Sequence, residues 1–235
     1  MLNPKLKALA EKIQDKKLRS MVTGLLENPT FEIDGKNYSG LPLEVSPGGL
    51  SNHHSYPGGY VEHVASTANI ALAMCNSIEK VYHGKVNRDL VIAGVLLHDI
   101  FKPITYEANE GGGYSSTGLA DYMDHLSLAI SELVRRGFPL DVVHIVSAHH
   151  GNYGPIRPHT VEALVCHLAD LTDSRFNSEI LNAGRYLARK AGGGELFGLT
   201  SKEAFEIIRS KSLENWKGVA RKAEEIRRRR ETHKA

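Results

Sequence analysis

Apolar residues recur at helical spacing in several separate stretches of this chain, and glycine or proline lies near most of the breaks between them. The clearest stretches are 61–81, 89–101, 119–136, 140–150 and 160–176. An apolar residue at every third or fourth position marks one buried face of an α-helix, because the helix turns once in about 3.6 residues. Such faces must be covered by other helices, so the sequence predicts an all-α body.

The remaining segments predict additions to this body. Residues 4–27 carry an apolar stripe among lysines, which predicts one N-terminal surface helix. Residues 31–59 are rich in Gly, Pro, Ser and Asn, so we expect an extended arm, with Asp34-Gly35 as the turn of a small hairpin. Residues 104–117 predict a loop or short hairpin that covers a site. From Ser201 onward a helical pattern predicts a C-terminal helical extension.

Composition narrows the class of protein. A length of 235 residues with 41% hydrophobic content suits one domain with a single core. The net charge of +2 is too small to indicate a nucleic acid or a membrane as partner. The two cysteines lie in apolar helical patterns and no cleavable apolar segment follows the polar N-terminus, so we expect a cytoplasmic protein. The longest apolar run, near 90–97, is far shorter than the roughly 20 residues that cross a bilayer.

A block of arginines at 227–230 lies near the C-terminus. Interspersed glutamates favour an ion-paired, solvent-exposed helix face, and a weak contact of this tail with nucleic acid is the alternative. The oligomeric state is left open.

Twelve histidines are many for this length, and several lie at the ends of apolar helical patterns. Neutral imidazole nitrogens and carboxylate oxygens together suit divalent transition metals. A mixed set occurs in order along five separate predicted helices: His63, His98, Asp99, His125, His149, His150 and Asp170. For any single histidine, a hydrogen-bonded, partly buried side chain is an equal alternative. Only a bundle that turns these helix faces inward would bring the whole set together.

The order of this set resembles the HD superfamily of metal-dependent phosphohydrolases, over roughly residues 50–176. The runs Asn52-His53-His54, Gly58-Gly59, Glu62-His63, Leu96-Leu97-His98-Asp99 and His167-Leu168-Ala169-Asp170 are similar to those of the bacterial HD-class 3'-to-5' exoribonucleases. The resemblance implies a single HD domain over 1–235. It comprises an N-terminal helix and arm (1–49), an HD core (50–176) and the C-terminal extension (177–235).

The resemblance also implies two divalent metal ions, of Mn, Fe, Co, Ni or Zn. One ion would be held by His63, His98, Asp99 and Asp170, and the other by bridging Asp99 with His125, His149 and His150. Catalytic roles fall to Asp99 and Lys102. Substrate-binding roles fall to His53, His54, Lys102 and Asp173, although a solvated lysine and exposed loop histidines are alternatives.

The chain departs from the family at two places. Phe101 stands two positions after Asp99, where the family often has glycine, so we expect a slightly different backbone there. The stretch before residue 50 is too short for the oligonucleotide-binding barrel of the related exoribonucleases, which argues against processive RNA degradation.

By this resemblance we expect a phosphodiesterase that acts on a nucleotide, a cyclic nucleotide or short RNA with a metal-activated water. The alternatives are a nucleotide phosphomonoesterase, a di-iron oxygenase-like enzyme and a non-catalytic RNA-binding or regulatory HD module.

Overall fold

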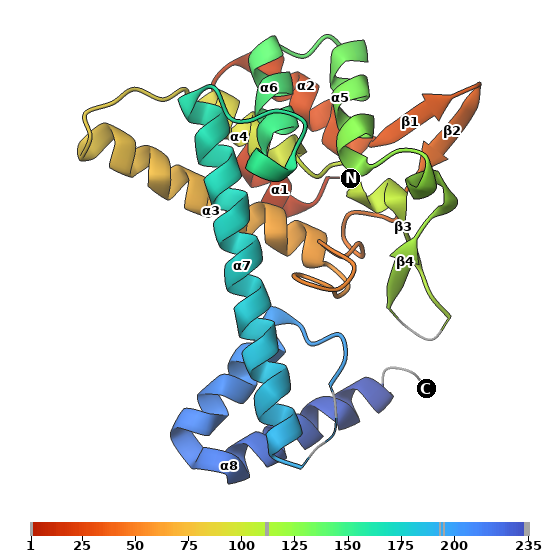
Figure 1. Ribbon diagram of the computed structural model, residues 1–235, viewed down its shortest axis with the longest axis vertical. Coiled ribbons are helices and arrows are strands. Elements are labelled where there is room, and N and C mark those ends of the chain that lie inside the picture. Colours follow the sequence, from red (N-terminus) through yellow and green to blue (C-terminus); the bar gives the residue numbers. More distant parts are fainter. Residues whose placement is uncertain (1, 111–112, 193, 195, 233–235) are drawn as a thin grey trace.

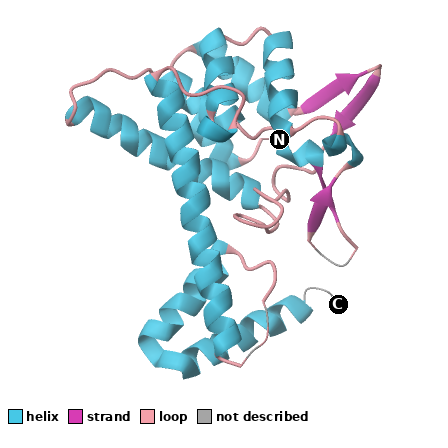
Figure 2. Ribbon diagram, in the orientation of Figure 1, coloured by secondary structure: helices cyan, strands magenta, loops and turns pink. Residues whose placement is uncertain are grey.

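The computed structural model describes residues 2–110, 113–192, 194 and 196–232, and these residues form a predominantly helical molecule (Figures 1 and 2). The body consists of five helices: α3 (Gly59–Lys80), α4 (Arg88–Leu97), α5 (His125–Arg135), α6 (Leu140–Ala148) and α7 (Val161–Lys190). The predicted all-α fold class is therefore confirmed. No helix in the described part of the chain is both long and apolar enough to span a bilayer.

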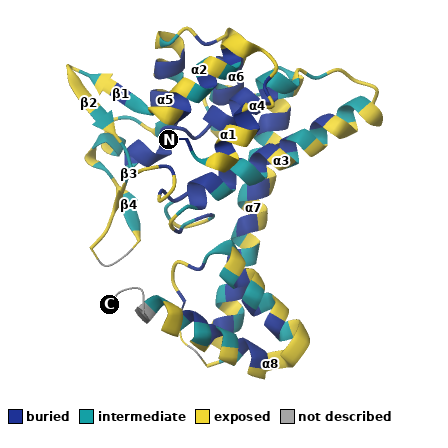
Figure 3. Cartoon of the chain, turned by 180° about the vertical axis from the view of Figure 1, so that it is seen from behind, coloured by how far each residue is buried: buried dark blue, intermediate teal, exposed yellow. Residues whose placement is uncertain are grey.

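Helix α4 is the centre of the body. It packs against α3, α6 and α7, and every residue from Val91 to Leu97 is buried. Figure 3 shows that buried residues gather where these helices meet. Gly94 allows the closest approach, because a Cβ atom there would lie 2.2 Å from Cγ2 of Ile145 on α6. The C-terminal end of α4 is thereby fixed deep inside the molecule, and residues 98 and 99 follow directly from it.

The N-terminal segment forms two helices, α1 (Pro4–Ala10) and α2 (Lys16–Glu27), where the sequence predicted one surface helix. The break has a tertiary cause, since the carboxylate of Asp89 on α4 accepts hydrogen bonds from the backbone N–H groups of Gln14 and Asp15. The apolar residues of both helices, including Leu6 and Val22, are buried in the main core.

Two antiparallel hairpins confirm the turn predictions. Strands β1 (Thr30–Ile33) and β2 (Lys36–Ser39) are joined by Asp34-Gly35, whose φ angles of 51° and 70° are those of a tight hairpin turn. Strands β3 (Tyr106–Ala108) and β4 (Tyr114–Ser116) form the second hairpin, and its residues 111–112 lie outside the described part. Between β2 and α3 the chain forms an arm without helix or strand.

The C-terminal part is built on one continuous helix. α7 runs unbroken through residue 176, where the sequence placed the end of the core, and extends away from the body (Figure 1). Helix α8 (Ser201–Thr232) bends at Asn215, which has a φ of 55°, and packs against the far end of α7. This packing has its own apolar cluster, formed by residues of α7, α8 and their connection together with Tyr56 of the arm.

The arginine block forms ion pairs along α8. Arg230 pairs with Glu203 and Arg229 with Glu206, both at the opposite end of the same bent helix. The expected ion-paired helix face is therefore present, and the arginines help to close the two halves of α8 on each other. A weak contact of this tail with nucleic acid stays a prediction.

Candidate metal centre

The seven predicted ligand residues meet in one place, and most of them lie at helix ends. His98 and Asp99 follow α4, His125 opens α5, and His149 and His150 follow α6. His63 lies in the second turn of α3 and Asp170 in the third turn of α7. Helices α3, α4 and α7 pack against one another, and α6 packs against α4 and α7, which is the inward-facing bundle that the set required.

The first group of ligand atoms surrounds Oδ2 of Asp99. Nε2 of His63 lies 3.3 Å from this oxygen and 3.3 Å from Oδ1 of Asp170. Nε2 of His98 lies 3.3 Å from the same Asp99 oxygen and 3.1 Å from Nε2 of His63. The atoms that His63, His98 and Asp170 offer lie within 4.8 Å of one another.

The second group surrounds the other oxygen of the same carboxylate. Oδ1 of Asp99 lies 3.4 Å from Nε2 of His125 and 3.6 Å from Nε2 of His149. The atoms that these residues and His150 can offer again lie within 4.8 Å of one another. The two oxygens of Asp99 therefore face two different sets of ligands.

Backbone and carboxylate acceptors fix the orientation of three of these imidazoles. Nδ1 of His98 donates to the carbonyl of Val95, and Nδ1 of His149 donates to the carbonyl of Val146, each at 2.7 Å. Because a carbonyl only accepts, Nδ1 carries the proton and the Nε2 lone pair points into the centre. Nδ1 of His63 has an equivalent partner in the carboxylate of Asp173.

The donor set fits divalent metal ions. Among the described residues, Oδ1 of Asp99 and the Nε2 atoms of His125 and His149 are buried without a hydrogen-bond partner, whereas Oδ2 of Asp99 faces the ammonium of Lys102 at 2.5 Å. Such atoms are costly to bury unless something pairs with them. At this centre they are lone pairs and anionic oxygens that face one another, so the partner they require is a cation.

The electrostatics of the two groups agree with this fit. Burial lowers the pKa of His125 to about 4, so this imidazole is neutral and able to ligate. Burial opposes the charged form of His63, yet the carboxylates of Asp170 and Asp173 raise its pKa well above the ordinary value. The negative charge of these carboxylates therefore stabilises a proton on His63. The same negative charge would stabilise a metal cation bound there.

Lys102 is buried, which excludes the solvated alternative. Its Nζ lies 2.5 Å from Oδ2 of Asp99 and donates to the carbonyl of Gly48 at 3.3 Å. Burial disfavours its charge, but Asp99 outweighs this effect and raises the pKa of Lys102. A permanent ammonium therefore lies beside the shared carboxylate.

The arm brings His53 and His54 against the same centre. The ring centroid of His53 lies 5.1 Å from that of His63, and one ring nitrogen from each of His53, His54 and His63 lies within 4.8 Å of the other two. Burial and the neighbouring His63 lower the pKa of His53 to about 4 and that of His54 to about 3. Both rings are thus neutral, and the exposed alternative does not apply, because His54 is 1% exposed.

Sequence reasoning missed the residues that hold this arm. His54 has a φ of 46°, and its N–H donates to Oδ1 of Asn177 at 2.7 Å. Asn177 follows Asp173 by one helical turn, so the spacing along α7 could have indicated it. The carbonyl of Gly48, which accepts from Lys102, carries no sequence signal. A Cβ atom at Gly48 would lie 2.8 Å from Cβ of His54, which explains the glycine.

Two further features named from the sequence are Asp173 and Phe101. The carboxylate of Asp173 lies against Nδ1 of His63, on the side away from the metal ligands, and its contact with substrate stays a prediction. Phe101 has φ −100° and ψ 2°, a conformation that needs no glycine, and its ring packs edge-on against Phe31 of β1.

The fold and this centre define a metal-dependent phosphohydrolase of the HD type. The HD domain family matches residues 60–175, and the chain belongs to this family. It is 41% identical to the dihydroneopterin 2',3'-cyclic phosphate phosphodiesterase of Methanocaldococcus jannaschii over 187 residues. These residues make up 80% of this chain and 75% of that protein. The predicted phosphodiesterase class is thus confirmed.

A more distant relative is the 3'-5' exoribonuclease YhaM of Bacillus subtilis. The identity is 28% over 159 residues, which covers 61% of this chain and 48% of that protein. The predicted similarity to the exoribonuclease group is therefore confirmed over about half of that enzyme's length. No solved structure matches the chain.

Proposed function

We propose that this phosphodiesterase holds two divalent metal ions bridged by Asp99. The observation that carries this proposal is the division of one carboxylate between two ligand groups, with Oδ2 toward His63 and His98 and Oδ1 toward His125 and His149. A single ion would leave one of these groups without its partner. His150 completes the second group and Asp170 the first.

Bound at this centre, divalent ions would lower the pKa of a water molecule and neutralise charge on phosphate oxygens. The chain's own residues supply the rest. The ammonium of Lys102 stabilises the negative charge that a phosphodiester gains as it is attacked, because it is buried beside Asp99 and cannot be screened by solvent. His53, partly buried on the arm beside His63, has a neutral ring that can donate an N–H hydrogen bond to a phosphate oxygen.

We propose a small cyclic phosphodiester as substrate, in line with the cyclic phosphate in the name of the archaeal relative. In the reaction, an oxygen from water bonds to phosphorus, one P–O bond of the ring breaks, the attacking water gives up one proton to solvent, and the released alkoxide oxygen takes one up. The product is a phosphomonoester. A short RNA is the second candidate, supported by the similarity to the exoribonuclease.

Elemental analysis and hydrolysis assays on the same preparation test this proposal. The panel contains bis-p-nitrophenyl phosphate, a nucleoside 2',3'-cyclic phosphate, a dinucleotide and a nucleoside monophosphate, each with Mn, Co, Ni, Zn or Mg. We expect close to two ions per chain and turnover of the diesters. Turnover of the monophosphate alone would identify a phosphomonoesterase.

The same experiments would also identify the two remaining alternatives, an oxygenase-like enzyme and a non-catalytic module. Oxygen consumption by an iron-loaded preparation that hydrolyses no ester would identify an oxygenase-like enzyme. Metal without any turnover would identify a non-catalytic module. A preparation that binds no divalent ion under any of these conditions would disprove the metal centre.

A further inference from the structure

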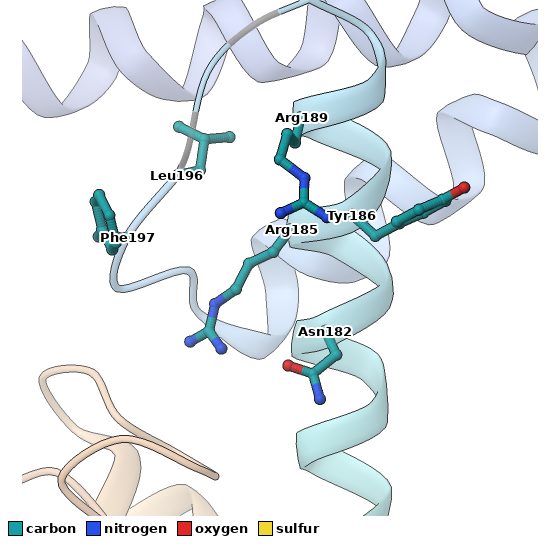
Figure 4. A pocket seen from close by; sticks show the side chains of 6 residues that line it. All are labelled: Asn182, Arg185, Tyr186, Arg189, Leu196 and Phe197. Atoms are coloured by element: carbon teal, nitrogen blue, oxygen red, sulfur yellow. The ribbon is translucent and has the colours of Figure 1, made fainter.

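A cavity of about 320 Å³ lies beside the far half of α7, away from the metal centre. It is lined by residues of α7 and of the connection to α8: Asn182, Arg185, Tyr186, Arg189, Leu196 and Phe197. Figure 4 shows both arginines on the side of α7 that faces Phe197, whereas Tyr186 extends from another side of the helix. The cavity therefore combines two cationic side chains with an apolar wall.

The two guanidinium groups have no internal partner. Among the described residues, the guanidinium of neither Arg185 nor Arg189 makes a hydrogen bond or an ion pair, whereas those of Arg221 and Arg230 on the adjoining α8 are paired with glutamates. Two unpaired guanidiniums one helical turn apart repel each other unless an anion lies between them. Phosphate is the anion whose geometry their donors match.

The apolar wall suits the other half of a nucleotide. Phe197 is 76% exposed and lines the cavity from the connection to α8, across from Arg185 (Figure 4). A large aromatic side chain left so exposed beside arginines is the arrangement on which nucleobases stack. The amide of Asn182 adds a donor and an acceptor at the end of the cavity nearer the body.

A continuous line of contacts joins the cavity to the metal centre. The ring of His53 packs against His63, and the adjacent Asn52 carbonyl accepts a hydrogen bond from Ser178 of α7 at 3.2 Å. Ser178, Asn182 and Arg185 follow at intervals of one turn, so they share one face of the helix. This face starts at the arm and ends in the cavity.

We propose that this cavity binds a phosphate and base of a single-stranded oligoribonucleotide whose scissile linkage lies at the metal centre. Arg185 comes twelve residues after Asp173 on α7, which is roughly 18 Å at about 1.5 Å per residue. A stacked strand advances about 3.4 Å per nucleotide, so roughly five nucleotides span this distance. The inference rests on the proposed phosphodiesterase function and extends its substrate class to short RNA.

The test separates binding from catalysis. Fluorescence anisotropy in EDTA measures the affinity of a labelled octaadenylate for the parent protein, for the double variant Arg185→Ala with Arg189→Ala, and for Arg209→Ala. Arg209 is an exposed arginine of α8 outside the cavity and serves as the matched control. We expect the double variant alone to weaken binding by about tenfold or more and to lower the slope of log K against log salt by about 1.4, as for two lost contacts to single-stranded phosphate.

Substrate length provides the second measurement. With metal present, the ratio of kcat/KM for the octanucleotide to kcat/KM for a dinucleotide should fall in the double variant and remain constant in Arg209→Ala. Equal losses on both substrates, equal affinities of the parent and double variant, or no octanucleotide binding by the parent would overturn the proposal. A parent that binds the octanucleotide but cleaves no diester would instead contradict the proposed function, because the EDTA measurement does not depend on catalysis.

Discussion

Oδ2 of Asp173 lies 2.7 Å from Nδ1 of His63, on the opposite side of the imidazole from the other ligand atoms. The carboxylate accepts a hydrogen bond from Nδ1–H of His63, so Nε2 can direct its lone pair toward a cation bound by Asp99 and Asp170. Asp173 is 3% exposed and also lies 3.7 Å from Nδ1 of His54, which leaves little room for a substrate group beside it. From these contacts we expect Asp173 to act as a positioning residue for His63 and for the arm.

Replacing Asp173 tests this role. Asp173→Asn keeps the shape but removes the charge, so His63 becomes a weaker and less firmly oriented ligand. We expect metal affinity to fall by about 10–100-fold, as for other carboxylates that support a ligating histidine. A chelating dye in competition measures this affinity. A variant with parental metal affinity and a raised KM would instead support the substrate-binding role predicted from the sequence.

Asp99 is expected to be the least replaceable ligand, because its two oxygens serve two groups. Asp99→Asn leaves one weakly ligating oxygen and one donor, so both ions should be lost together and hydrolysis should fall by at least about 100-fold. Elemental analysis of the purified variant measures the metal content. Asp121→Asn, at an exposed position, is the matched control. Equal metal content in the Asp99 variant and the parent would refute the bridging role.

Lys102 should affect turnover more than metal binding. Lys102→Met removes the ammonium that lies 2.5 Å from Asp99, and in the metal-loaded protein we expect kcat to fall by about 100-fold at nearly unchanged metal content. Lys102→Arg should recover part of this loss. Lys85→Met, at an exposed position, is the control for the loss of one charge. An unchanged kcat would show that Lys102 only neutralises the centre.

Local sequence patterns were sufficient to predict much of the fold. The periodicity of residues 61–81 and 140–150 indicated helices α3 and α6 within a few residues, because each helix buries one continuous face. The ligand set was recognised from the order of residue types along the chain. Neither argument could give the proximity of His63 and His125, which depends on how separate helices pack.

Features set by long-range contacts escaped prediction for the same reason. The break between α1 and α2 depends on Asp89, more than 70 residues away along the chain. The role of Asp173 depends on a histidine from α3. The cavity beside Arg185 exists only because the connection to α8 folds back over α7, and nothing in the local sequence around this arginine indicates that packing.

Metal removal should lower the thermal stability of the protein. The ligands come from helices α3, α4, α5, α6 and α7, so an ion that binds only the folded chain stabilises all of these helices together. At a free metal concentration of 100 times Kd, one site contributes about 2.7 kcal/mol, which corresponds to a Tm shift of roughly 5–10 °C for a chain of this size. Calorimetry with and without EDTA measures the shift. An identical Tm for demonstrably loaded and stripped protein would contradict the centre.

Asn177 should control the arm without affecting the metal ligands directly. Its amide accepts from the N–H of His54 and donates to Oγ of Ser201 on α8, so it joins the arm, α7 and α8. Asn177→Ala leaves these buried groups unpaired, which should cost about 1–3 kcal/mol, and it frees His54 from its left-handed conformation. We expect faster hydrogen exchange across residues 48–58 and a raised KM at parental metal content. Asn69→Ala, which removes only a bond within α3, is the control. If exchange in the arm of Asn177→Ala equals that of this control, then the arm is held by its glycine contacts and by Ser178 rather than by Asn177.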